Sequence, residues 1–433
     1  MFFVVMFIFL FVFVLNMIKI YFCHRWMNIE QKKAIKNTSV TCKFPLFLLI
    51  PVLNEQKIIR ETYRHFKDLI HNFDNVYTVF VTTEKETTNT EKTYDIICDL
   101  IRNDNEDKIF VVNYPCVKGV MAHQLNYAVD FLKKRINTND FWIGVYNADS
   151  RINVDTIKYS INKINTTKNE KYCMQQYSYY YCQTKRHKGL MQSCALWQSR
   201  WSITFEMARA RMQLLISQKD MPSIFKIVVE KMNYIIGHGF FINANLLLSL
   251  GGLPQNTINE DACLGYLLNC NDIKILPIPF LELAESPNNM RVYLNQQNTW
   301  FNGPRQAFLY YSIYKSETLS TKARSFVFAL KLFLHAIYWV GAPILLLLVC
   351  PLTIDSIAQL ILWLIVIILH LPVTNMVVCF FLKRHTNKND FIIPKASTMC
   401  ILFYIFHCLG PLKNLWKQIK GENTIENKYK TER

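Results

Sequence analysis

The sequence lacks the glycine-rich loops that hold phosphate groups in dinucleotide-binding and P-loop proteins. It contains only 12 glycines in 433 residues, and neither a GxGxxG nor a GxxxxGK pattern occurs. Such loops need glycine because their backbone must approach the phosphates closely. Their absence counts against nicotinamide-dependent redox chemistry and against nucleotide hydrolysis of the P-loop type.

Paired cysteines are also absent. The 13 cysteines are scattered, their number is odd, and no Cys-x-x-Cys pair occurs. Cys263 and Cys270, the closest pair outside the apolar segments, would lie on one helix about two turns apart, too far for a disulfide. The pattern indicates reduced thiols, as in the cytosol or a membrane.

Acidic residues are scarce relative to basic ones. There are 32 Asp and Glu against 49 Lys and Arg, so the formal net charge is +17. Many of the basic residues flank apolar segments or lie in the tail Lys413–Arg433. This distribution is typical of binding to the anionic cytoplasmic face of a membrane, and we expect no nucleic-acid partner.

Long hydrophobic runs are what the sequence has in excess. The run Phe2–Ile18 is long enough to cross a bilayer as a helix, and Lys19 and Arg25 follow it. A cleaved signal peptide is the alternative, but it would need a preceding basic region and a small-residue cleavage site. We therefore assign residues 1–22 to an N-terminal transmembrane helix, with the chain after it in the cytosol.

Three further apolar runs lie near the other end. Phe326–Cys350 and Ile357–Leu382 are joined by a short connector without Lys or Arg, which predicts a hairpin entered from the cytosol. Phe391–Leu409 contains a proline and a lysine, and a full crossing would place the basic tail outside. We expect this run to be re-entrant or interfacial. The sequence thus predicts a multi-pass protein with a C-terminal membrane region at 325–412 and a basic cytosolic tail at 413–433.

Two histidines, His335 and His370, lie within these predicted spans. An ionisable residue inside a bilayer is a candidate functional group. A hydrogen-bonded packing role is an equally good interpretation.

The middle of the chain alternates between short apolar strands and amphipathic helices. Four buried strands linked by helices predict a mostly parallel sheet covered on both faces, and hence an α/β domain. Ligands of such sheets bind at the carboxyl ends of the strands. The predicted strands are Phe44–Val52, Val76–Thr82, Lys108–Val112 and Trp142–Tyr146.

Polar residues occupy all four of these strand ends. Asn54 and Glu55 follow the first strand, Glu84 the second, Asn113 the third and Asn147–Ser150 the fourth. A single polar strand end is usually a turn. Four in succession predict one ligand-binding rim.

Two groups of carboxylates are candidates for chemistry. Asp149 is placed to hold a divalent cation that neutralises a diphosphate, or alternatively to cap the helix near Val154. Glu260 and Asp261 open the predicted helix Ala262–Leu268, where the helix dipole stabilises negative charge. In the functional interpretation Asp261 is a general base for an acceptor hydroxyl, and Glu260 positions it or contacts the acceptor. In the alternative both residues only cap the helix.

An aromatic motif precedes the C-terminal membrane region. Gln296, Gln297 and Trp300 lie close together in an amphipathic stretch. A tryptophan flanked by amides suits a sugar ring, with stacking on one face and hydrogen bonds at the edge. A tryptophan anchored at the membrane interface is the alternative.

In this order the motifs resemble those of the family 2 glycosyltransferases of the GT-A fold, the group of the cellulose, chitin, hyaluronan and poly-N-acetylglucosamine synthases. The resemblance covers about Phe44–Gln306 and implies a GT-A catalytic domain, which we place at 44–310. It implies Asp149 as the ligand of a Mg²⁺ or Mn²⁺ ion. The donor-binding residues implied by the resemblance are Pro51, Asn54, Glu55, Glu84, Lys118, Asn126, Asn147 and Asp149.

The catalytic and acceptor motifs are also similar to those of the family. Glu260 and Asp261 match its Glu-Asp pair, whose Asp is the catalytic base. Gln296, Gln297 and Trp300 lie where the membrane synthases carry Gln-x-x-Arg-Trp, which implies contacts with the acceptor.

Three positions depart from the family pattern. Asn147 stands where the metal motif has its first Asp, and Thr299 replaces the Arg of the acceptor motif. Thr82-Thr83-Glu84 ends the second strand where many relatives carry paired aspartates. The first two changes each remove a charge, which weakens the expectation of metal dependence and processivity; the third leaves the donor nucleotide open.

The resemblance implies an inverting glycosyltransferase with a cytosolic catalytic domain. It would move a sugar from a nucleotide-sugar donor, with UDP-sugars favoured, to a saccharide or lipid-linked acceptor at the membrane, for cell-surface polysaccharide synthesis. Membrane lipid and an accessory membrane subunit are further candidate partners. Two alternatives stay open: a degenerate scaffold subunit of a polysaccharide complex, or a transferase that places one sugar on a lipid carrier.

Overall fold

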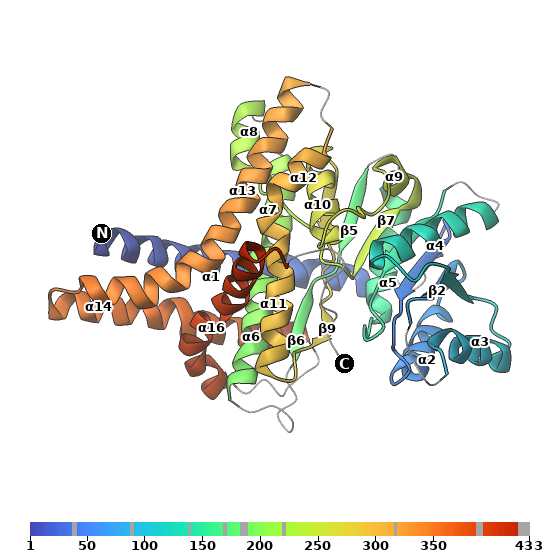
Figure 1. Ribbon diagram of the computed structural model, residues 1–433, viewed down its shortest axis with the longest axis horizontal. Helices are drawn as coiled ribbons and strands as arrows, with labels where there is room; N and C mark the ends of the chain where they lie inside the picture. Colours follow the sequence, from blue (N-terminus) through green and yellow to red (C-terminus); the bar gives the residue numbers. More distant parts are fainter. Residues whose placement is uncertain are drawn as a thin grey trace. The chain divides into compact units, whose positions relative to one another are not determined.

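The computed structural model (Figure 1) forms two compact units. The sheet unit comprises Ile29–Tyr177 and Tyr234–Ala284, and the helical unit comprises Met1–Asn28, Ser178–Asn233 and Glu285–Arg433. Residues 178–233 and 285–310, which fall within the catalytic domain predicted at 44–310, thus group with the helical unit. The structure describes residues 1–36, 41–86, 91–136, 140–167, 171–181, 189–218, 222–315, 318–386 and 393–422.

The described part of the sheet unit is built on seven strands in the order β3-β2-β1-β4-β7-β5-β8. The four strands predicted from the sequence are confirmed, and they run parallel to one another. β7 runs antiparallel to both β4 and β5, so the sheet is mostly parallel. The strands are β1 (Leu46–Pro51), β2 (Val76–Thr83), β3 (Ile109–Tyr114), β4 (Trp142–Val145), β5 (Tyr172–Gln175), β7 (Phe240–Asn243) and β8 (Lys274–Pro277).

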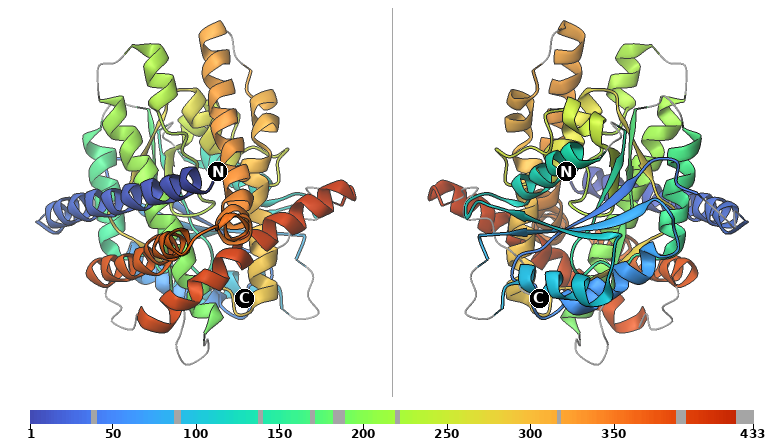
Figure 2. Two further views of the ribbon diagram at one scale, coloured as in Figure 1. Left: turned by 90° about the vertical axis from the view of Figure 1, so that its left-hand side faces the viewer. Right: turned by 90° about the vertical axis from the view of Figure 1, so that its right-hand side faces the viewer.

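The sheet is buried on both faces, and β1 shows why. Leu46, Leu48 and Ile50 belong to one apolar core, while Phe47 and Leu49 belong to the other. A strand whose alternate residues enter two cores reads as a continuous apolar run, as this one does. Figure 2 shows α2 and α3 on one side of the strands and α4 on the other. The helices of this unit are α2 (Ile59–Ile70), α3 (Thr93–Asp104), α4 (Met121–Arg135), α5 (Val154–Thr166), α9 (Ala244–Ser249) and α10 (Glu260–Cys270).

The helical unit brings the two ends of the chain together. Phe9 of the N-terminal helix shares a core with Trp197, Tyr293 and Phe403, and His24 Nδ1 lies 2.7 Å from His385 Nε2. The helices are α1 (Phe2–Lys36), α6 (Leu190–Trp201), α7 (Ala208–Ser217), α8 (Ser223–Val229), α11 (Met290–Arg305), α12 (Ala307–Ile313), α13 (Leu319–Ile344), α14 (Ile357–Ile368), α15 (Thr374–His385) and α16 (Ile393–Ile419). Short strands β6 (Ser178–Tyr181) and β9 (Glu282–Glu285) complete the described elements together with the π-helical turns η1 (Ser202–Met207), η2 (Leu345–Val349) and η4 (Leu369–Val373) and the 3₁₀ turn η3 (Cys350–Thr353).

Four helices among the described residues are long and apolar enough to cross a membrane: Phe2–Ala34, Leu319–Thr353, Ile357–His385 and Met399–Ile419. The first three contain or overlap the predicted spans. The fourth overlaps the run expected to be re-entrant, and by length and composition it also qualifies as a span. Because α16 continues to Ile419, the predicted tail at 413–433 begins inside a helix, and residues 423–433 lie outside the described residues.

The outward face of α1 is strongly apolar. Phe3, Phe7 and Phe11 are 64%, 69% and 55% exposed. Large apolar side chains gathered on one exposed face mark a surface that another apolar phase covers. By length and composition α1 is one of the candidate membrane spans.

Candidate active site

The pairing of β7 with β4 brings a distant loop to the carboxyl end of β4. Gly239 N–H donates to Val145 O at 2.6 Å, and Phe240 pairs with Val145 in the antiparallel register. The loop Ile236–Gly239, which precedes β7, therefore lies where β4 ends. The segment Asn147–Ser150 begins at that same place.

Asp261 is attached to this loop. Its Oδ2 accepts a hydrogen bond from Gly237 N–H at 2.7 Å, and its Oδ1 accepts from Ala262 N–H at 2.8 Å. Both carboxylate oxygens are therefore oriented by backbone donors, one in the loop before β7 and one in the first turn of α10. The structure thus brings Asp261 to the end of β4, although about 110 residues separate it from Asn147 in sequence.

Close packing holds α10 against the chain before this loop. A Cβ added to Gly265 would lie 2.4 Å from Tyr234 Cα and 2.6 Å from Ile235 N. Only glycine permits this approach of a helix to a backbone segment. Gly265 lies one turn after Asp261, so the contact sets the position of the carboxylate relative to Gly237.

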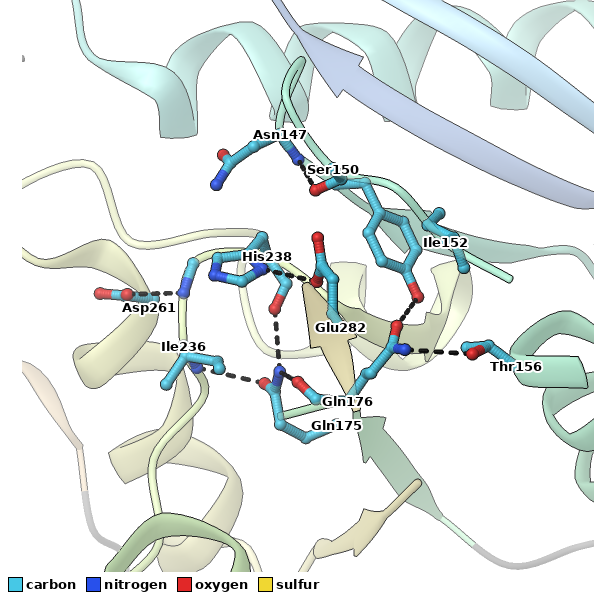
Figure 3. Close-up of polar contacts among 12 residues, drawn as sticks. Asn147, Ser150, Ile152, Thr156, Gln175, Gln176, Ile236, His238, Asp261 and Glu282 are labelled. Carbon is cyan, nitrogen blue, oxygen red and sulfur yellow. Dashed lines mark hydrogen bonds and ion pairs between the residues drawn. The ribbon is translucent and has the colours of Figure 1, made fainter. Parts of the chain in front are cut away.

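Gln175, the last residue of β5, and Gln176 after it bind the loop Ile236–Gly239; Figure 3 shows the contacts of Gln175. Gln175 Nε2 donates to His238 O at 2.8 Å, and Ile236 N–H donates to Gln175 Oε1 at 3.1 Å. Gln176 N–H donates to Gly239 O at 2.7 Å. Both glutamine side chains are buried, so the loop is bound on its inner side at three points.

His238 and Glu282 form an ion-pair contact in this area. Nδ1 of His238 lies 3.0 Å from Oε2 of Glu282, whose side chain is almost fully buried (Figure 3). Neither residue was predicted as a site residue from the sequence. The only local signal was the Gly237-His238-Gly239 triplet, in which Gly239 adopts a positive φ of 70°.

The turn after β4 is held by the helix α2. Ala148 O accepts from Thr62 Oγ1 at 2.5 Å, and Ile152 N–H donates to Nε2 of His65 at 3.0 Å. Ala148 is buried, whereas Asn147 and Asp149 on either side of it are half-buried. The two candidate metal ligands are therefore both partly exposed.

Capping does not explain Asp149. The cap of α5 is Asn153, whose side chain accepts from Thr156 N–H at 2.9 Å. An acidic residue at Asp149 thus has no role as the N-cap of this helix. The metal interpretation stays a prediction.

His65 is held neutral by its surroundings. Burial is the main cause that lowers the pKa of His65, and Arg151 adds to the effect. A neutral imidazole can accept at Nε2, as the bond from Ile152 N–H requires. Protonation of His65 would therefore release one of the contacts that hold the turn after β4.

Glu84 and Asn113, from the ends of β2 and β3, meet directly. Asn113 Nδ2 donates to Glu84 Oε1 at 2.5 Å, and Lys92 Nζ donates to Glu84 Oε2 at 2.9 Å. The hydrogen bond from Lys92, followed by that from Asn113, lowers the pKa of Glu84. These two strand ends therefore lie side by side at one edge of the sheet, and ligand binding there stays a prediction.

Asn54, at the end of β1, adopts a left-handed backbone with φ of 55°. Its N–H donates to Oε1 of Glu86 at 2.9 Å, and Oε2 of Glu86 accepts from Thr93 N–H at 2.8 Å. Glu86 is buried and links the turn after β1 to the start of α3. Non-glycine residues in this conformation are uncommon and concentrate at functional turns. Glu55 beside it is also buried, and Pro51 is the last residue of β1.

The remaining donor-binding candidates differ in environment. Lys118 is exposed, and its loop is held by Lys85 Nζ, which donates to Gly119 O at 3.2 Å. Asn126 donates to Leu253 O at 2.9 Å and accepts from Leu253 N–H at 2.8 Å. The Asn126 amide therefore holds the turn before α10.

The acceptor candidates belong to the helical unit, on α11. Gln296 Oε1 accepts a hydrogen bond from Gln198 Nε2 at 2.8 Å. Gln297 is buried against Gly410, where an added Cβ would lie only 2.5 Å from the Cβ of Gln297. Trp300 lies beside Tyr180, with ring centroids 6.5 Å apart. In the sheet unit, Glu260 is 1% exposed, whereas Asp261 beside it is partly exposed.

The metal prediction rests on few ligands. No group of three or more His, Cys, Asp or Glu suited to a metal ion occurs among the described residues. Asp149 and Asn147 offer one carboxylate and one amide oxygen. Mg²⁺ commonly binds proteins through one or two carboxylates, and takes its other ligands from water and substrate phosphates. The two residues fit a metal that arrives with a diphosphate.

Comparison with known proteins gives a fold. No protein-family model matches the chain, and no curated protein matches it by sequence. The structure of the mannosyltransferase PcManGT from Pyrobaculum calidifontis, in complex with GDP-Man and Mn²⁺, matches with a TM-score of 0.50. The match covers 94% of this chain and 99% of that one, at 11% identity. The chain has a glycosyltransferase fold.

Two structures of S. aureus TarS also match, each at 12% identity. Residues 1–349 of TarS give a TM-score of 0.42 over 87% of this chain and 92% of that one. The longer TarS chain gives 0.40 over 89% and 55%. A shared fold does not establish a shared reaction, which has to be argued from the residues of the site.

Proposed function

We propose that this chain is an inverting glycosyltransferase that uses a nucleotide-sugar donor. The observation that supports this most directly is the link from β4 to Asp261. Val145 O binds Gly239, and two residues earlier Gly237 binds the Asp261 carboxylate. The candidate base Asp261 and the candidate diphosphate site at Asp149 are thereby both connected to the carboxyl end of β4.

The donor would lie across the carboxyl ends of β1 to β4. Asn54, Glu55 and Pro51 would contact the nucleoside, with Glu84 at the far end of the rim. Lys118 would approach the diphosphate, and Asn126 would act by holding the turn before α10. A Mg²⁺ or Mn²⁺ ion bound by Asp149, with Asn147 as a second oxygen ligand, would supply charge compensation for the leaving diphosphate.

Asp261 would act as the base. Its carboxylate accepts the proton of an acceptor hydroxyl as that oxygen bonds to the anomeric carbon. The bond from the anomeric carbon to the diphosphate breaks on the opposite side, and the nucleoside diphosphate leaves with the electron pair. Attack from the side opposite the leaving group inverts the anomeric configuration. Glu260 is too deeply buried for this role and would position the first turn of α10.

The acceptor would be a saccharide or a lipid-linked sugar at the membrane, contacted by Gln296, Gln297 and Trp300. The four membrane-span candidates support a multi-pass protein. The basic residues that follow the first span, Lys19 and Arg25, favour a cytosolic sheet unit, and nucleotide sugars are cytosolic. UDP-sugars remain the favoured donors from the sequence. GDP-mannose has to be tested as well, because PcManGT was solved with GDP-Man.

A donor panel tests the function. Membranes that contain the protein are incubated with radiolabelled UDP-, GDP- and TDP-sugars, with Mn²⁺ or with EDTA. The product is then sized and tested for extraction into organic solvent. Transfer from one donor, lost in the Asp261→Asn variant and retained in the exposed-helix variant Asp99→Asn, supports the proposal. A full panel without transfer to any acceptor fraction overturns it.

A catalytically inactive subunit of a polysaccharide complex is the second candidate. Asn147 favours it, because an amide replaces one of the charges that a metal site uses. The Asn147→Asp variant distinguishes the two. An enzyme should gain Mn²⁺-dependent transfer or hold the metal more tightly, whereas a scaffold should remain inactive.

A further inference from the structure

The helical unit contains a cavity of about 340 Å³ that the transfer mechanism does not use. Its lining includes four basic side chains, and no Asp or Glu is among the residues that line it. Such a one-sided charge distribution attracts an anion. The four basic residues are Lys19, Arg200, Arg209 and Lys331.

Arg200 is the most deeply buried of these cations. It is 5% exposed, and no ion pair involves it among the described residues. Its Nη1 donates to Asn375 Oδ1 at 3.2 Å, and its guanidinium carbon lies 4.7 Å from the centre of the Trp197 ring. These contacts orient the guanidinium without neutralising it. A buried charge without a countercharge is costly, so a bound anion would stabilise it.

The cavity wall also contains polar atoms that lack partners. Both ring nitrogens of His335 and of His370 are buried without a hydrogen bond among the described residues, and so is Nε1 of Trp339. Each of these side chains is at least nine-tenths buried and lines the cavity. Buried donors and acceptors are normally satisfied, and a group of unsatisfied ones around one cavity indicates a polar ligand.

The rest of the wall is aromatic. The rings of His335, Phe205 and Trp201 lie against one another. The His335 centroid is 4.0 Å from that of Phe205 and 5.0 Å from that of Trp201, and the latter two are 4.3 Å apart. The rings of Trp339 and His407 are 5.1 Å apart and nearly parallel. A wall of flat rings with cations among them suits a molecule that has an apolar part and a charged part.

The cavity reaches the outside of the unit along α13. Leu334 and Tyr338 line it, yet they are 52% and 39% exposed. Both lie in the membrane-span candidate Leu319–Thr353. A ligand that enters between them would come from the bilayer and not from water, which favours a lipid over a free phosphate.

We propose that this cavity binds the phosphate headgroup of a phosphorylated lipid. Arg200 and Lys19 would bind the phosphate oxygens, and the stacked aromatic rings would contact the first part of the apolar chain. The site adds to the proposed transferase function without depending on it, because it uses none of the residues of the sheet unit.

A binding assay tests this site with the full chain in neutral detergent micelles. Dodecyl phosphate is the probe, and dodecyl maltoside and inorganic phosphate are the comparison ligands. Binding is followed by tryptophan fluorescence, since three tryptophans line the cavity: Trp197, Trp201 and Trp339. We expect saturable binding of dodecyl phosphate that is at least about tenfold tighter than that of either comparison ligand.

Two variants and one control keep the result interpretable. Arg200→Gln and Lys19→Gln should each weaken dodecyl phosphate binding by about tenfold or more. Arg384→Gln removes a surface charge of the same unit that does not line the cavity, and should bind normally. If Arg200→Gln fails to fold, the dodecyl phosphate affinity of Lys19→Gln decides the outcome.

Three outcomes would overturn the proposal. One is equal binding of dodecyl phosphate and dodecyl maltoside, which would mean that the phosphate is not recognised. Another is equal binding of inorganic phosphate, which would assign the site to a free anion. The third is normal binding by a correctly folded Lys19→Gln variant.

Discussion

The rim of the sheet unit and the cavity of the helical unit differ in how their polar side chains are hydrogen-bonded. At the rim, Asn54, Glu84 and Asp261 all accept or donate hydrogen bonds within the protein. In the cavity, His335 and His370 have buried ring nitrogens with no hydrogen bond among the described residues. Internal hydrogen bonds orient the rim groups before a ligand arrives, whereas the cavity groups need a ligand for their satisfaction.

The sign of the charges differs as well. The rim candidates include the carboxylates Glu84, Asp149 and Asp261, as proton transfer and metal binding require. The cavity is lined by basic residues and by no carboxylate. We conclude that the two regions suit different ligands. A substitution in one region should leave the activity or ligand binding of the other unchanged.

The largest effect is expected from Asp261→Asn. The substitution keeps the size of the side chain but removes the base, so transfer should fall by roughly 10²–10⁴-fold. Dodecyl phosphate binding should be unchanged. Initial rates of radiolabelled transfer and the fluorescence titration are measured on the same preparation. Near-normal transfer by Asp261→Asn would remove Asp261 from the mechanism.

Gly265→Ala should damage the rim through packing. The new methyl group would meet the Tyr234–Ile235 backbone, so the helix or the loop must move. Overpacking of this kind costs about 1–3 kcal/mol in stability, and the shift of Asp261 relative to Gly237 should lower the turnover rate. Gly341→Ala is the matched control, since a Cβ there has no atom within 4 Å. Thermal unfolding midpoints and kcat values of the two variants are compared.

Glu86→Ala should loosen the turn after β1. It leaves the N–H groups of Asn54 and Thr93 without their acceptor, at a cost of about 1–3 kcal/mol for buried groups. Because Asn54 is a donor-binding candidate, KM for the nucleotide sugar should rise more than kcat falls. A variant that loses stability with unchanged KM would separate this turn from donor binding.

His65→Gln gives the smallest effect, visible as a change in pH dependence. Burial lowers the pKa of folded His65 below its unfolded value of about 6.5, so the unfolded chain binds the proton more readily. Stability is therefore present above about pH 6.5 and is lost as the pH falls through the lower folded pKa. Glutamine keeps an acceptor for Ile152 N–H but does not titrate.

The measurement is the unfolding midpoint between about pH 8 and about pH 5.5. The native protein should lose up to about 1 kcal/mol more than the variant, the value of one backbone hydrogen bond. Equal slopes for the native protein and His65→Gln would contradict the assignment.

Some features were predictable because their signal is local. The strands β1 to β4 are continuous apolar runs, and a strand buried on both faces needs such a run. The membrane-span candidates were predictable for the same reason, because length and composition define them. The meeting of Glu84 with Asn113 followed from the rule that neighbouring parallel strands end at one edge.

Other features had no local signal. β7 is four residues long and lies between β4 and β5 in the sheet, an arrangement that depends on pairing across about 100 residues. His238 meets Glu282, which is 44 residues away in the sequence, and Glu86 binds Asn54, which is 32 residues away. Capping by Asp149 was a reasonable alternative, but Asn153 is the residue that caps α5.

By itself, the sequence determined the mostly parallel sheet, the apolar segments at both ends and the polar residues at the strand ends. Each depends on the side-chain pattern of one segment, which burial or lipid contact dictates directly. Only the tertiary structure decided that the loop before β7 brings Gly237 to Asp261, and that Arg200 shares a cavity with Lys19. Both depend on contacts between distant segments, and these form only when the elements pack together.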